Sequence, residues 1–394
     1  MRNKRNNGEG SFRKDERRNL WIYSLSYEVD GQKGRKQFAG KTKGAAKQKS
    51  EVFLEGLKKP KDKGYTVEKW IEYWLNSIAR PQVRERTFEK YRSTLKNYVI
   101  PYMGELSLDG VNAGDLQEHL NDLLVSGGVK GTGISPSTVK ATRKYLMQAL
   151  DYAVERDLMA SNPVRKTKPP KSEKEDVVIL SDEQVAKLLD ETDELDNPFI
   201  ALMMRTIFTI AIHSGLRQGE LFALDWKNGV DFKNGCLVVT KTLSRIVGKG
   251  AVFCEPKTRT SRRNIPMSEK DMQLLKSYRE EQLKQEKQAI EYGFGYVNMH
   301  NLVFTSPNGQ PVHVSNFSRQ YFRPLMRAAG IPDSVTFHAF RHTHATRLLE
   351  RGVNVKLIQQ RLGHSNITTT LDIYSHVTQN MARDVIKAIE NFPE

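Results

Sequence analysis

The hydrophobic pattern predicts a small sheet near the beginning of the chain. In LWIYSLSYEV, residues 20–29, large apolar side chains recur at every second position, which is the period of a half-buried strand: Trp21, Tyr23, Leu25 and Tyr27. A turn at Asp30-Gly31 followed by GRKQFAG predicts a second strand, and GSFRKDE ahead of them predicts a third. Residues 43–59 then show helical periodicity that ends before Pro60, with inward positions Ala46, Val52, Phe53 and Leu57.

The next hundred residues carry helical periodicity throughout. Four segments show it, separated by glycine and proline: TVEKWIEYWLNSIA, ERTFEKYRSTLKNYVIPYMG, GDLQEHLNDLLVS and SPSTVKATRKYLMQALDYAVERD. The stretch GGVKGTGISP between the last two predicts a loop. VRKTKPPKSEKEDV, residues 164–177, is charged and interrupted by two prolines, which is typical of a linker. The predicted division is therefore 1–63, 64–163, linker 164–177 and 178–394.

The last segment predicts mostly helices around one β region. Ser181 and Gln184 form a capping box that begins the first helix. GVDFKNGCLVVTKTL predicts a hairpin through Asn234-Gly235, and AVFCEPKTRTSRRNIPM predicts a further edge hairpin. Near the end, an apolar stripe at helical spacing predicts a docking helix at about residues 378–392: Val377, Met381, Val385, Ile386 and Ile389.

Composition points to a polyanionic partner. The chain has 394 residues, too many for one hydrophobic core, so two or three domains are expected. Its 62 Lys and Arg against 46 Asp and Glu give a net charge of +16. Residues 1–63 alone hold 18 basic and 8 acidic side chains, a net charge of +10. A solvated basic tail is the alternative, but this segment also contains the predicted strands.

Composition also limits the cellular compartments in which the protein is expected. No apolar run is long enough to span a bilayer, and MRNKRNNGEGSFRK lacks the apolar segment of a signal peptide. Two cysteines, Cys236 and Cys254, suit a reducing compartment and exclude a cysteine-based metal cluster. We expect a soluble cytoplasmic protein without a membrane partner, associated with the nucleoid.

The stretch HAFRHTHA, residues 338–345, contains three histidines and one arginine. His338 and His342 stand four residues apart, a spacing that two zinc ligands on one helix face use. At 100° per residue, however, His344 shares the apolar stripe, whereas Arg341 lies beside the other two histidines near the helix N-terminus. A permanent guanidinium charge and a helix N-terminus favour an anion. Metal binding, phosphate binding and simple packing all remain open from this stretch alone.

Three further motifs accompany this stretch. SGLRQGEL places Arg217 at a turn between helices, QQRLGHSN places His364 after a C-capping Gly363, and TTTLDIYSHV contains Tyr374. Each has an ordinary explanation by itself. Together with HAFRHTHATRLL, PKTRTSRRNIP and the helical domain ending ASNPV, they strongly resemble the tyrosine recombinase family, the phage-type integrases. The resemblance covers about residues 60–390. The basic sheet resembles the arm-binding domain of lambda-like integrases and of integrases of conjugative transposons.

The resemblance implies a catalytic set. It makes Tyr374 the nucleophile, places Lys257 on a β-hairpin, and forms a phosphate cradle from Arg217, His338, Arg341 and His364. Such chemistry is physically sound, because an in-line displacement at phosphorus needs charge neutralisation, a nucleophile and a proton donor for the leaving oxygen. Two arginines supply the first without a metal, so neither metal nor cofactor is expected.

The resemblance also implies the fold and the partners. We expect a small β-sheet-plus-helix arm-binding module, an all-α core-binding domain of the SAM-like type, and a mixed α/β tyrosine recombinase catalytic domain. The expected partners are double-stranded DNA at core and arm sites, three further copies of the chain in a tetramer on DNA, and an excisionase or other directionality factor. The implied function is integration and excision of a mobile element. A chromosome-resolution recombinase, a type IB topoisomerase-like enzyme and a non-catalytic DNA-binding regulator are the alternatives.

Basic side chains outside the catalytic set are the candidates for DNA contact. On the predicted helices they stand opposite the apolar positions, where a solvated face is the equal alternative. We expect DNA contacts from Arg13, Arg35, Lys36, Arg92, Lys96, Lys140 and Arg143.

Overall fold

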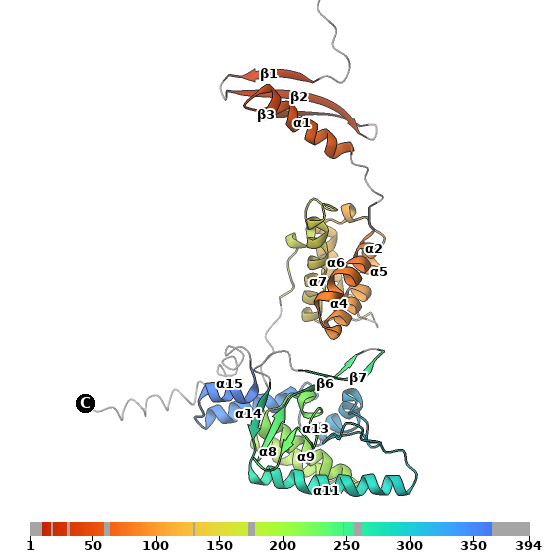
Figure 1. Ribbon diagram of the computed structural model, residues 1–394, viewed down its shortest axis with the longest axis vertical. Helices are drawn as coiled ribbons and strands as arrows, with labels where there is room; N and C mark the ends of the chain where they lie inside the picture. Colours follow the sequence, from red (N-terminus) through yellow and green to blue (C-terminus); the bar gives the residue numbers. More distant parts are fainter. Residues whose placement is uncertain are drawn as a thin grey trace, which may run out of the picture. The chain divides into compact units, whose positions relative to one another are not determined.

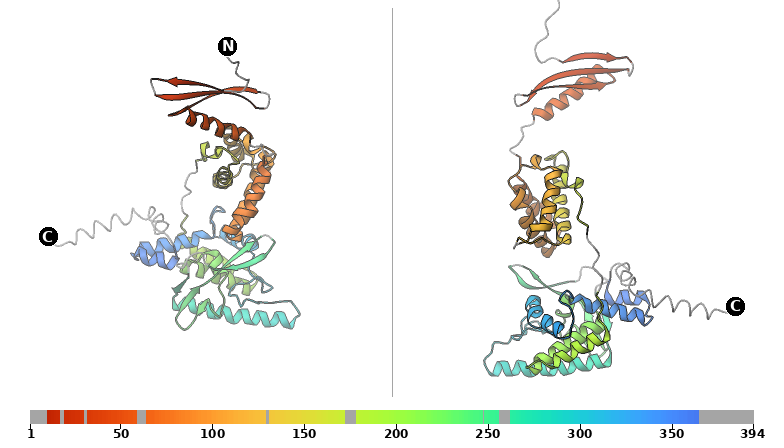
Figure 2. Two further views of the ribbon diagram at one scale, coloured as in Figure 1. Left: turned by 45° about the horizontal axis from the view of Figure 1, so that its top comes forward. Right: turned by 180° about the vertical axis from the view of Figure 1, so that it is seen from behind.

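The computed structural model describes residues 10–16, 19–29, 32–58, 64–128, 131–171, 178–246, 248–255 and 262–364. The chain divides into two compact units, Met1–Ser172 and Glu173–Glu394. The first unit contains the N-terminal sheet and a helical domain, and the second contains a mixed α/β domain (Figures 1 and 2). Within the described ranges, no helix combines the length and apolarity that crossing a membrane requires.

The N-terminal module is a three-stranded antiparallel sheet with one helix on one face. Its strands β1 (Ser11–Asp15), β2 (Leu20–Val29) and β3 (Gln32–Gly40) follow chain order, and α1 (Lys43–Lys58) comes next. The core joins Tyr23, Leu25 and Ala46, and the Tyr27 ring meets the α1 ring of Phe53 edge-on at 5.1 Å. The predicted alternation along β2 is therefore confirmed, because its odd-numbered apolar residues face α1.

The helical domain forms where the sequence predicts it. Its main helices are α2 (Val67–Tyr73), the π-helical turn η1 (Trp74–Ala79), α4 (Glu85–Tyr98), α6 (Ala113–Ser126) and α7 (Pro136–Glu155). Short elements connect them: α3 (Arg80–Gln82), α5 (Ile100–Met103), η2 (Leu108–Gly110) and η3 (Pro163–Lys166). Trp70 lies at the centre, 1% exposed, and its indole N–H donates to the carbonyl of Ala149 on α7 at 2.8 Å. Ser135 caps α7.

The linker begins later than residue 164. Val164 and Thr167 are buried in the helical domain, and the backbone N–H of Lys168 donates to Gln117 on α6 at 2.7 Å. The prediction missed the packing of these few residues because the segment as a whole is highly charged. Their backbone and apolar groups contact α6 and α7.

The second unit surrounds one strongly apolar helix. This helix, α9 (Pro198–Ser214), packs against α8 (Asp182–Asp193), α11 (Glu269–Glu291) and α14 (His338–Glu350). The remaining helices are α10 (Gln218–Leu221), α12 (Val314–Phe317), η5 (Ser318–Phe322), α13 (Arg323–Ala328) and α15 (Val355–Leu362). Helix α8 begins with the predicted capping box of Ser181 and Gln184. A core of aromatic side chains, including Phe208, Phe322 and Phe340, joins α9 to η5 and α14.

The β region of this unit differs from the prediction in one respect. The hairpin through Asn234-Gly235 is confirmed, with β4 (Val230–Asp231) paired to β5 (Cys236–Val239). The prediction of a further edge hairpin within AVFCEPKTRTSRRNIPM is wrong. Strand β8 (Arg263–Pro266) pairs with β5, whereas β7 (Gly250–Cys254) pairs with β6 (Thr242–Ile246). Gly248 and Gly250 both have positive φ and turn the chain between β6 and β7. This earlier glycine turn was the signal that the prediction overlooked.

Candidate active site

Arg217 lies at a sharp change of direction after α9. The helix ends at Ser214, and Gly215 takes the left-handed conformation with φ +65°. A Cβ at residue 215 would lie 2.7 Å from both the His344 ring and the Leu362 side chain, so only glycine fits. Arg217 then caps α10, and its guanidinium donates to Glu220 at 2.8 Å.

Arg341 is almost completely buried on α14, with 2% of its surface exposed. Its two terminal nitrogens donate to the carbonyls of Gly215 at 2.8 Å and Leu362 at 2.7 Å. Burial, followed by the charge of Arg217, lowers the pKa of Arg341 to about 9, which is still above neutral pH. The guanidinium therefore stays charged and is held in one orientation.

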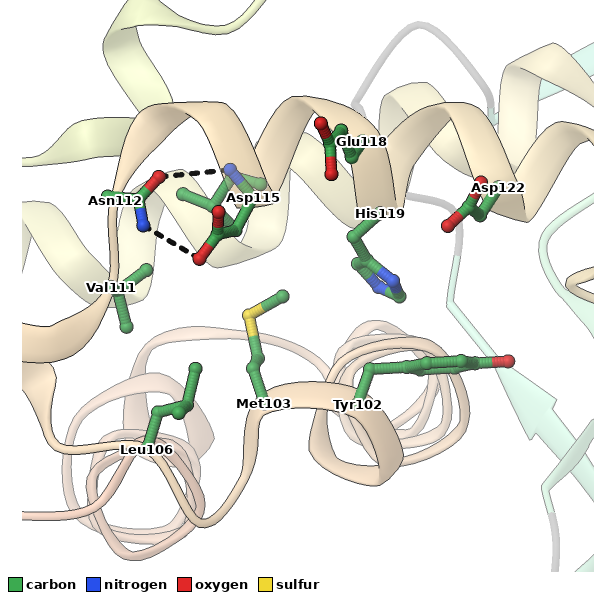
Figure 3. Close-up of a pocket in the computed structure, with 10 residues that line it drawn as sticks. Tyr102, Met103, Leu106, Val111, Asn112, Asp115, Glu118, His119 and Asp122 are labelled. Carbon is green, nitrogen blue, oxygen red and sulfur yellow. Dashed lines mark hydrogen bonds between the residues drawn. The ribbon is translucent and has the colours of Figure 1, made fainter.

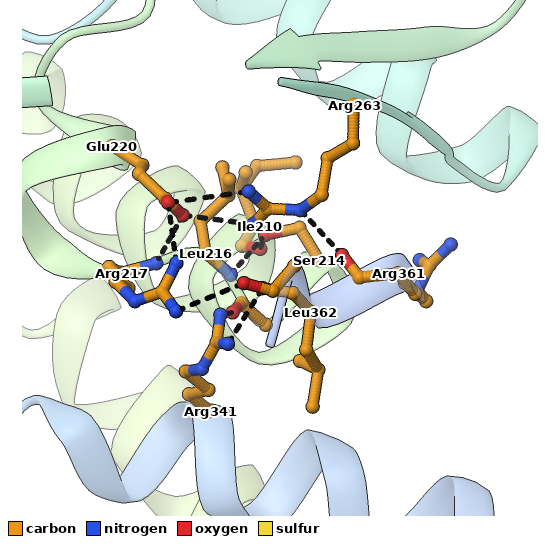
Figure 4. A network of polar contacts seen from close by, with 11 residues as sticks. Ile210, Ser214, Leu216, Arg217, Glu220, Arg263, Arg341, Arg361 and Leu362 are labelled. Carbon is orange, nitrogen blue, oxygen red and sulfur yellow. Dashed lines mark hydrogen bonds and ion pairs between the residues drawn. The ribbon is translucent and has the colours of Figure 1, made fainter. Parts of the chain in front are cut away.

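The C-terminal end of α15 gathers three arginines (Figure 4). The carbonyls of three consecutive residues accept hydrogen bonds: Arg361 from Arg263 at 2.6 Å, Leu362 from Arg341 at 2.7 Å, and Gly363 from Arg217 at 3.3 Å. The last carbonyls of a helix lack partners within the helix and carry the negative end of its dipole, so they bind cations well. Gly363 ends α15 in the left-handed conformation and exposes these carbonyls.

Glu220 is the acidic counterpart of this cluster. Its carboxylate is buried and accepts from Arg263 at 2.9 Å as well as from Arg217. Burial alone would raise the pKa of Glu220, but Arg263 and Arg217 outweigh it and hold the pKa below its usual value. Among the described side chains of the cluster, three guanidinium groups thus face one carboxylate, and the surplus positive charge suits an anion such as phosphate.

Two predicted histidines belong to the same site. Burial, followed by the neighbouring charges of His342, Arg341 and Arg217, lowers the pKa of His338 to about 4. Burial, followed by Arg341 and Arg217, lowers the pKa of His364 to about 3. The same two arginines act on both rings, so the structure brings together Arg217, His338, Arg341 and His364. Both rings are neutral at pH 7 and can exchange protons.

The other members of the predicted set lie outside the described residues. Lys257 falls within residues 256–261, and Tyr374 and the expected docking helix fall within residues 365–394. Arg263 lies two residues after the first gap and His364 directly precedes the second, and both belong to the site.

Sequence reasoning missed Glu220 and the individual role of Arg263. A signal for Glu220 existed, because its position three residues after Arg217 forms a capping box around the N-terminus of α10. For Arg263 the sequence offered only a crowded basic loop. His344 is buried as predicted, but it also accepts a hydrogen bond from Arg361 at 3.0 Å.

Comparison with known proteins agrees with this geometry. The sequence profile of the phage integrase family matches residues 179–381, and that of the phage integrase N-terminal SAM-like domain matches residues 66–124. The chain belongs to the phage integrase family. It is thus a tyrosine recombinase, an enzyme that transfers DNA strands.

Recombinase and integrase relatives cover from two thirds to more than nine tenths of this chain. A "Tyrosine recombinase XerC-like" protein of Caldanaerobacter subterraneus subsp. tengcongensis is 28% identical over 93% of this chain and 94% of its own length. The ICEBs1 integrase of Bacillus subtilis is 25% identical over 66% of this chain and 67% of its own length. Among solved structures, the Tn1549 transposon integrase in complex with transposon right end DNA is 26% identical, with a TM-score of 0.66 over 82% of this chain and 99% of that chain.

The sheet residues predicted to contact DNA divide between two faces. Directly paired residues of neighbouring strands lie on the same face of a sheet. Arg13 pairs with Ile22 and Arg35 pairs with Ser26, so both arginines lie on the face opposite α1. Lys36 pairs with Leu25, on the α1 side, and its ammonium lies 4.2 Å from the centre of the Phe53 ring. Lys36 is therefore separated from the two arginines.

The predicted DNA-contact residues of the helical domain also differ from one another. Lys96 is exposed, Lys140 is half-buried, and Arg92 pairs with Glu89 at 2.7 Å. A DNA contact by Arg143 stays a prediction that the structure does not favour, because its guanidinium donates to the hydroxyl and carbonyl of Thr167 and to the carbonyl of Val164. This side chain fastens η3 to α7.

The helical domain also contains an acidic hollow (Figure 3). It has a volume of about 270 Å³ between α5 and α6 and is lined by Asp115, Glu118 and Asp122. Carboxylates repel a polyanion, so this side is unsuited to DNA.

Proposed function

We propose that this recombinase integrates and excises a mobile element at specific DNA sites. The observation that carries the proposal is the convergence of Arg217 and Arg341 on the end of α15, beside His338 and His364. Two fixed guanidinium groups and two neutral imidazoles match the needs of a phosphodiester that gains charge during displacement. The names of the ICEBs1 and Tn1549 relatives support a mobile element as the substrate.

The proposed reaction replaces one phosphate ester with another. The hydroxyl of Tyr374 attacks the scissile phosphorus, and a 3′-phosphotyrosyl bond forms as the bond to the 5′-oxygen breaks. His338 accepts or shares the tyrosine proton, which a neutral ring permits, and Lys257 donates a proton to the departing 5′-oxygen. Arg217 and Arg341 neutralise the non-bridging oxygens while His364 donates to one of them. A 5′-hydroxyl from another strand reverses the step without ATP.

The proposed assembly is a tetramer on two duplexes that exchanges strands through a four-way junction. The N-terminal module binds arm-type sites, the two larger domains bind core sites on nucleoid DNA, and a directionality factor sets the balance between integration and excision. We expect the terminal helix at about residues 378–392 to dock on a neighbouring protomer. Truncation after Val377 should then weaken paired-site complexes on native gels while single half-site complexes survive. Tetramers that assemble as readily as with the intact chain would place the helix on its own domain.

Chromosome resolution is the second candidate, and the XerC-like relative favours it. DNA that flanks the coding sequence discriminates between the two. An element should carry its attachment site close to the gene and should yield an excised circle, whereas a resolution enzyme should act at a host site elsewhere.

The direct test of the mechanism is Tyr374→Phe. This change removes one oxygen and no positive charge, so covalent protein–DNA adducts on a nicked suicide duplex should disappear while duplex affinity stays nearly intact. An adduct that resists denaturant in the Phe variant would show that Tyr374 is not the nucleophile. Wild-type cleavage should also persist in EDTA, and a strict divalent-metal requirement would support the metal interpretation of His338 and His342.

A further inference from the structure

A second set of bonds lies behind the arginine cluster and centres on the Arg361 side chain. While the carbonyl of Arg361 accepts from Arg263, its guanidinium points away from the cluster (Figure 4). There it donates to three acceptors on three elements: Nε2 of His344 at 3.0 Å, the carbonyl of Pro266 at 2.9 Å, and the carbonyl of His213 at 3.0 Å. One side chain thus joins α15 to α14, to the end of β8 and to the end of α9.

His344 completes this connection as a neutral acceptor. Burial, followed by the charge of Arg361, lowers the pKa of His344 to about 3. Because Nε2 accepts the Arg361 hydrogen bond, the ring proton is on Nδ1, which bonds to the backbone of Ile212. Arg361 and His344 together therefore satisfy consecutive carbonyls, Ile212 and His213, at the C-terminal end of α9.

These two helix ends also supply the carbonyls that hold the catalytic arginines. Gly215, just beyond α9, accepts from Arg341, and Leu362 and Gly363, at the end of α15, accept from Arg341 and Arg217. Arg341 thus bonds to both helix ends within the arginine cluster. Arg361 and His344 connect the same two helix ends outside that cluster. A shift of either end would misplace the guanidinium groups that face the phosphate.

We propose that Arg361 is a positioning residue for strand cleavage: by its own bond to His213 and through His344, it holds the ends of α9 and α15 at the separation that Arg217 and Arg341 require. This inference rests on the roles proposed for those two arginines. An arginine suits the task because its planar group has five donors in fixed directions, whereas a lysine ammonium is a single point that reaches fewer acceptors.

The test measures single-turnover adduct formation by the full-length chain on a nicked suicide duplex from the flanking attachment site. Arg361→Leu should slow cleavage by about 10-fold to 100-fold, the cost of a small misplacement of catalytic groups, with duplex affinity unchanged. Arg361→Lys should fall between it and wild type. The matched control is Arg351→Leu, which removes an exposed arginine from a hollow that Arg361, His344 and His213 also line. This change does not touch the α9–α15 connection, so the variant should cleave as wild type does.

A second substrate separates positioning from loss of folded protein. A methylphosphonate at the scissile position replaces one charged oxygen with methyl, so less charge has to be neutralised by the arginines. The Arg361→Leu deficit should therefore shrink, to within about threefold, on this neutral linkage. Equal slowing on both linkages, or wild-type rates on both, would overturn the proposal. If wild type forms no adduct, or Tyr374→Phe still forms one, the proposed function itself fails instead.

His344 supplies an independent arm. His344→Gln keeps an acceptor for Arg361 and should retain most activity. His344→Leu removes that acceptor and should slow cleavage in the same way as Arg361→Leu but by less, because the Arg361 bonds to His213 and Pro266 remain. The Arg361→Leu/His344→Leu double variant should be slowed by much less than the product of the two single defects, because both residues hold the same two helix ends. Multiplying defects would show that the two residues act separately, and the proposed pair would be wrong.

Discussion

The second unit, Glu173–Glu394, which contains the candidate active site and is here called the catalytic unit, and the N-terminal sheet both carry arginines. The arginines of the two regions differ in burial and in hydrogen bonding. Arg341 is 2% exposed and fixed by two carbonyls, whereas Arg13 and Arg35 are exposed on an open sheet face. A charge that stabilises a transition state has to be oriented before the substrate arrives, whereas a charge that attracts DNA acts through solvent and is screened by salt. The surroundings of an arginine therefore indicate which task it serves.

The strongest test of this contrast replaces arginine with lysine in both regions. Arg341→Lys keeps the charge but cannot bridge Gly215 and Leu362 as a planar fork, so cleavage should fall by about 10² to 10³-fold while DNA affinity changes little. Arg35→Lys should change neither quantity, because an exposed charge needs no fixed geometry. Single-turnover cleavage and gel-shift titrations measure both. Equal tolerance at the two positions would remove the distinction.

Lowering the pH should destabilise the catalytic unit more than the N-terminal sheet, and this is the second largest expected effect. Burial is the first cause that lowers the pKa of His338, His342, His344 and His364 in the catalytic unit. Between pH 6.5 and about 4, these histidines therefore bind protons in the unfolded chain but stay neutral in the folded unit. Protons then favour the unfolded state, so the free energy of unfolding falls as pH falls. Even one such proton changes the folding equilibrium by about tenfold per pH unit. Glu220, with its lowered pKa, adds a loss at still lower pH.

The sheet module is the internal control for this experiment, since residues 1–63 contain no histidine. Hydrogen exchange read by mass spectrometry at pH values from 7 to 4.5, after correction for the intrinsic exchange rate, should show protection lost from α9 and α14 before it is lost from β2. Parallel loss in both regions would mean that the buried histidines do not govern acid stability.

Local patterns made much of the molecule predictable. The alternation along β2, the capped helices and the turns at Gly215 and Gly363 depend on neighbours in sequence, and the catalytic motifs could be recognised when they were taken together. Long-range partners could not be read in this way. The pairing of β8 with β5, the Arg143 bonds to η3 and the Arg361 contact with His344 all join segments that only the folded chain brings together.

The smallest expected effect concerns the open face of the sheet. A phosphate contact contributes a slope of roughly −0.9 to log K against log salt, so Arg13→Ala with Arg35→Ala should make the slope for arm-site binding shallower by about 1.8. Lys36→Ala should change it less, because that side chain lies over Phe53 on the α1 side. Arg143→Ala should leave the slope unchanged and instead lower the unfolding free energy by about 1–3 kcal/mol, since it removes the guanidinium that donates to the buried Thr167. Salt titrations of arm-site binding and urea unfolding measure these quantities. If Lys36→Ala or Arg143→Ala reduced the slope as much as the two sheet arginines do, exposure on the open face would not be what selects the residues that contact DNA.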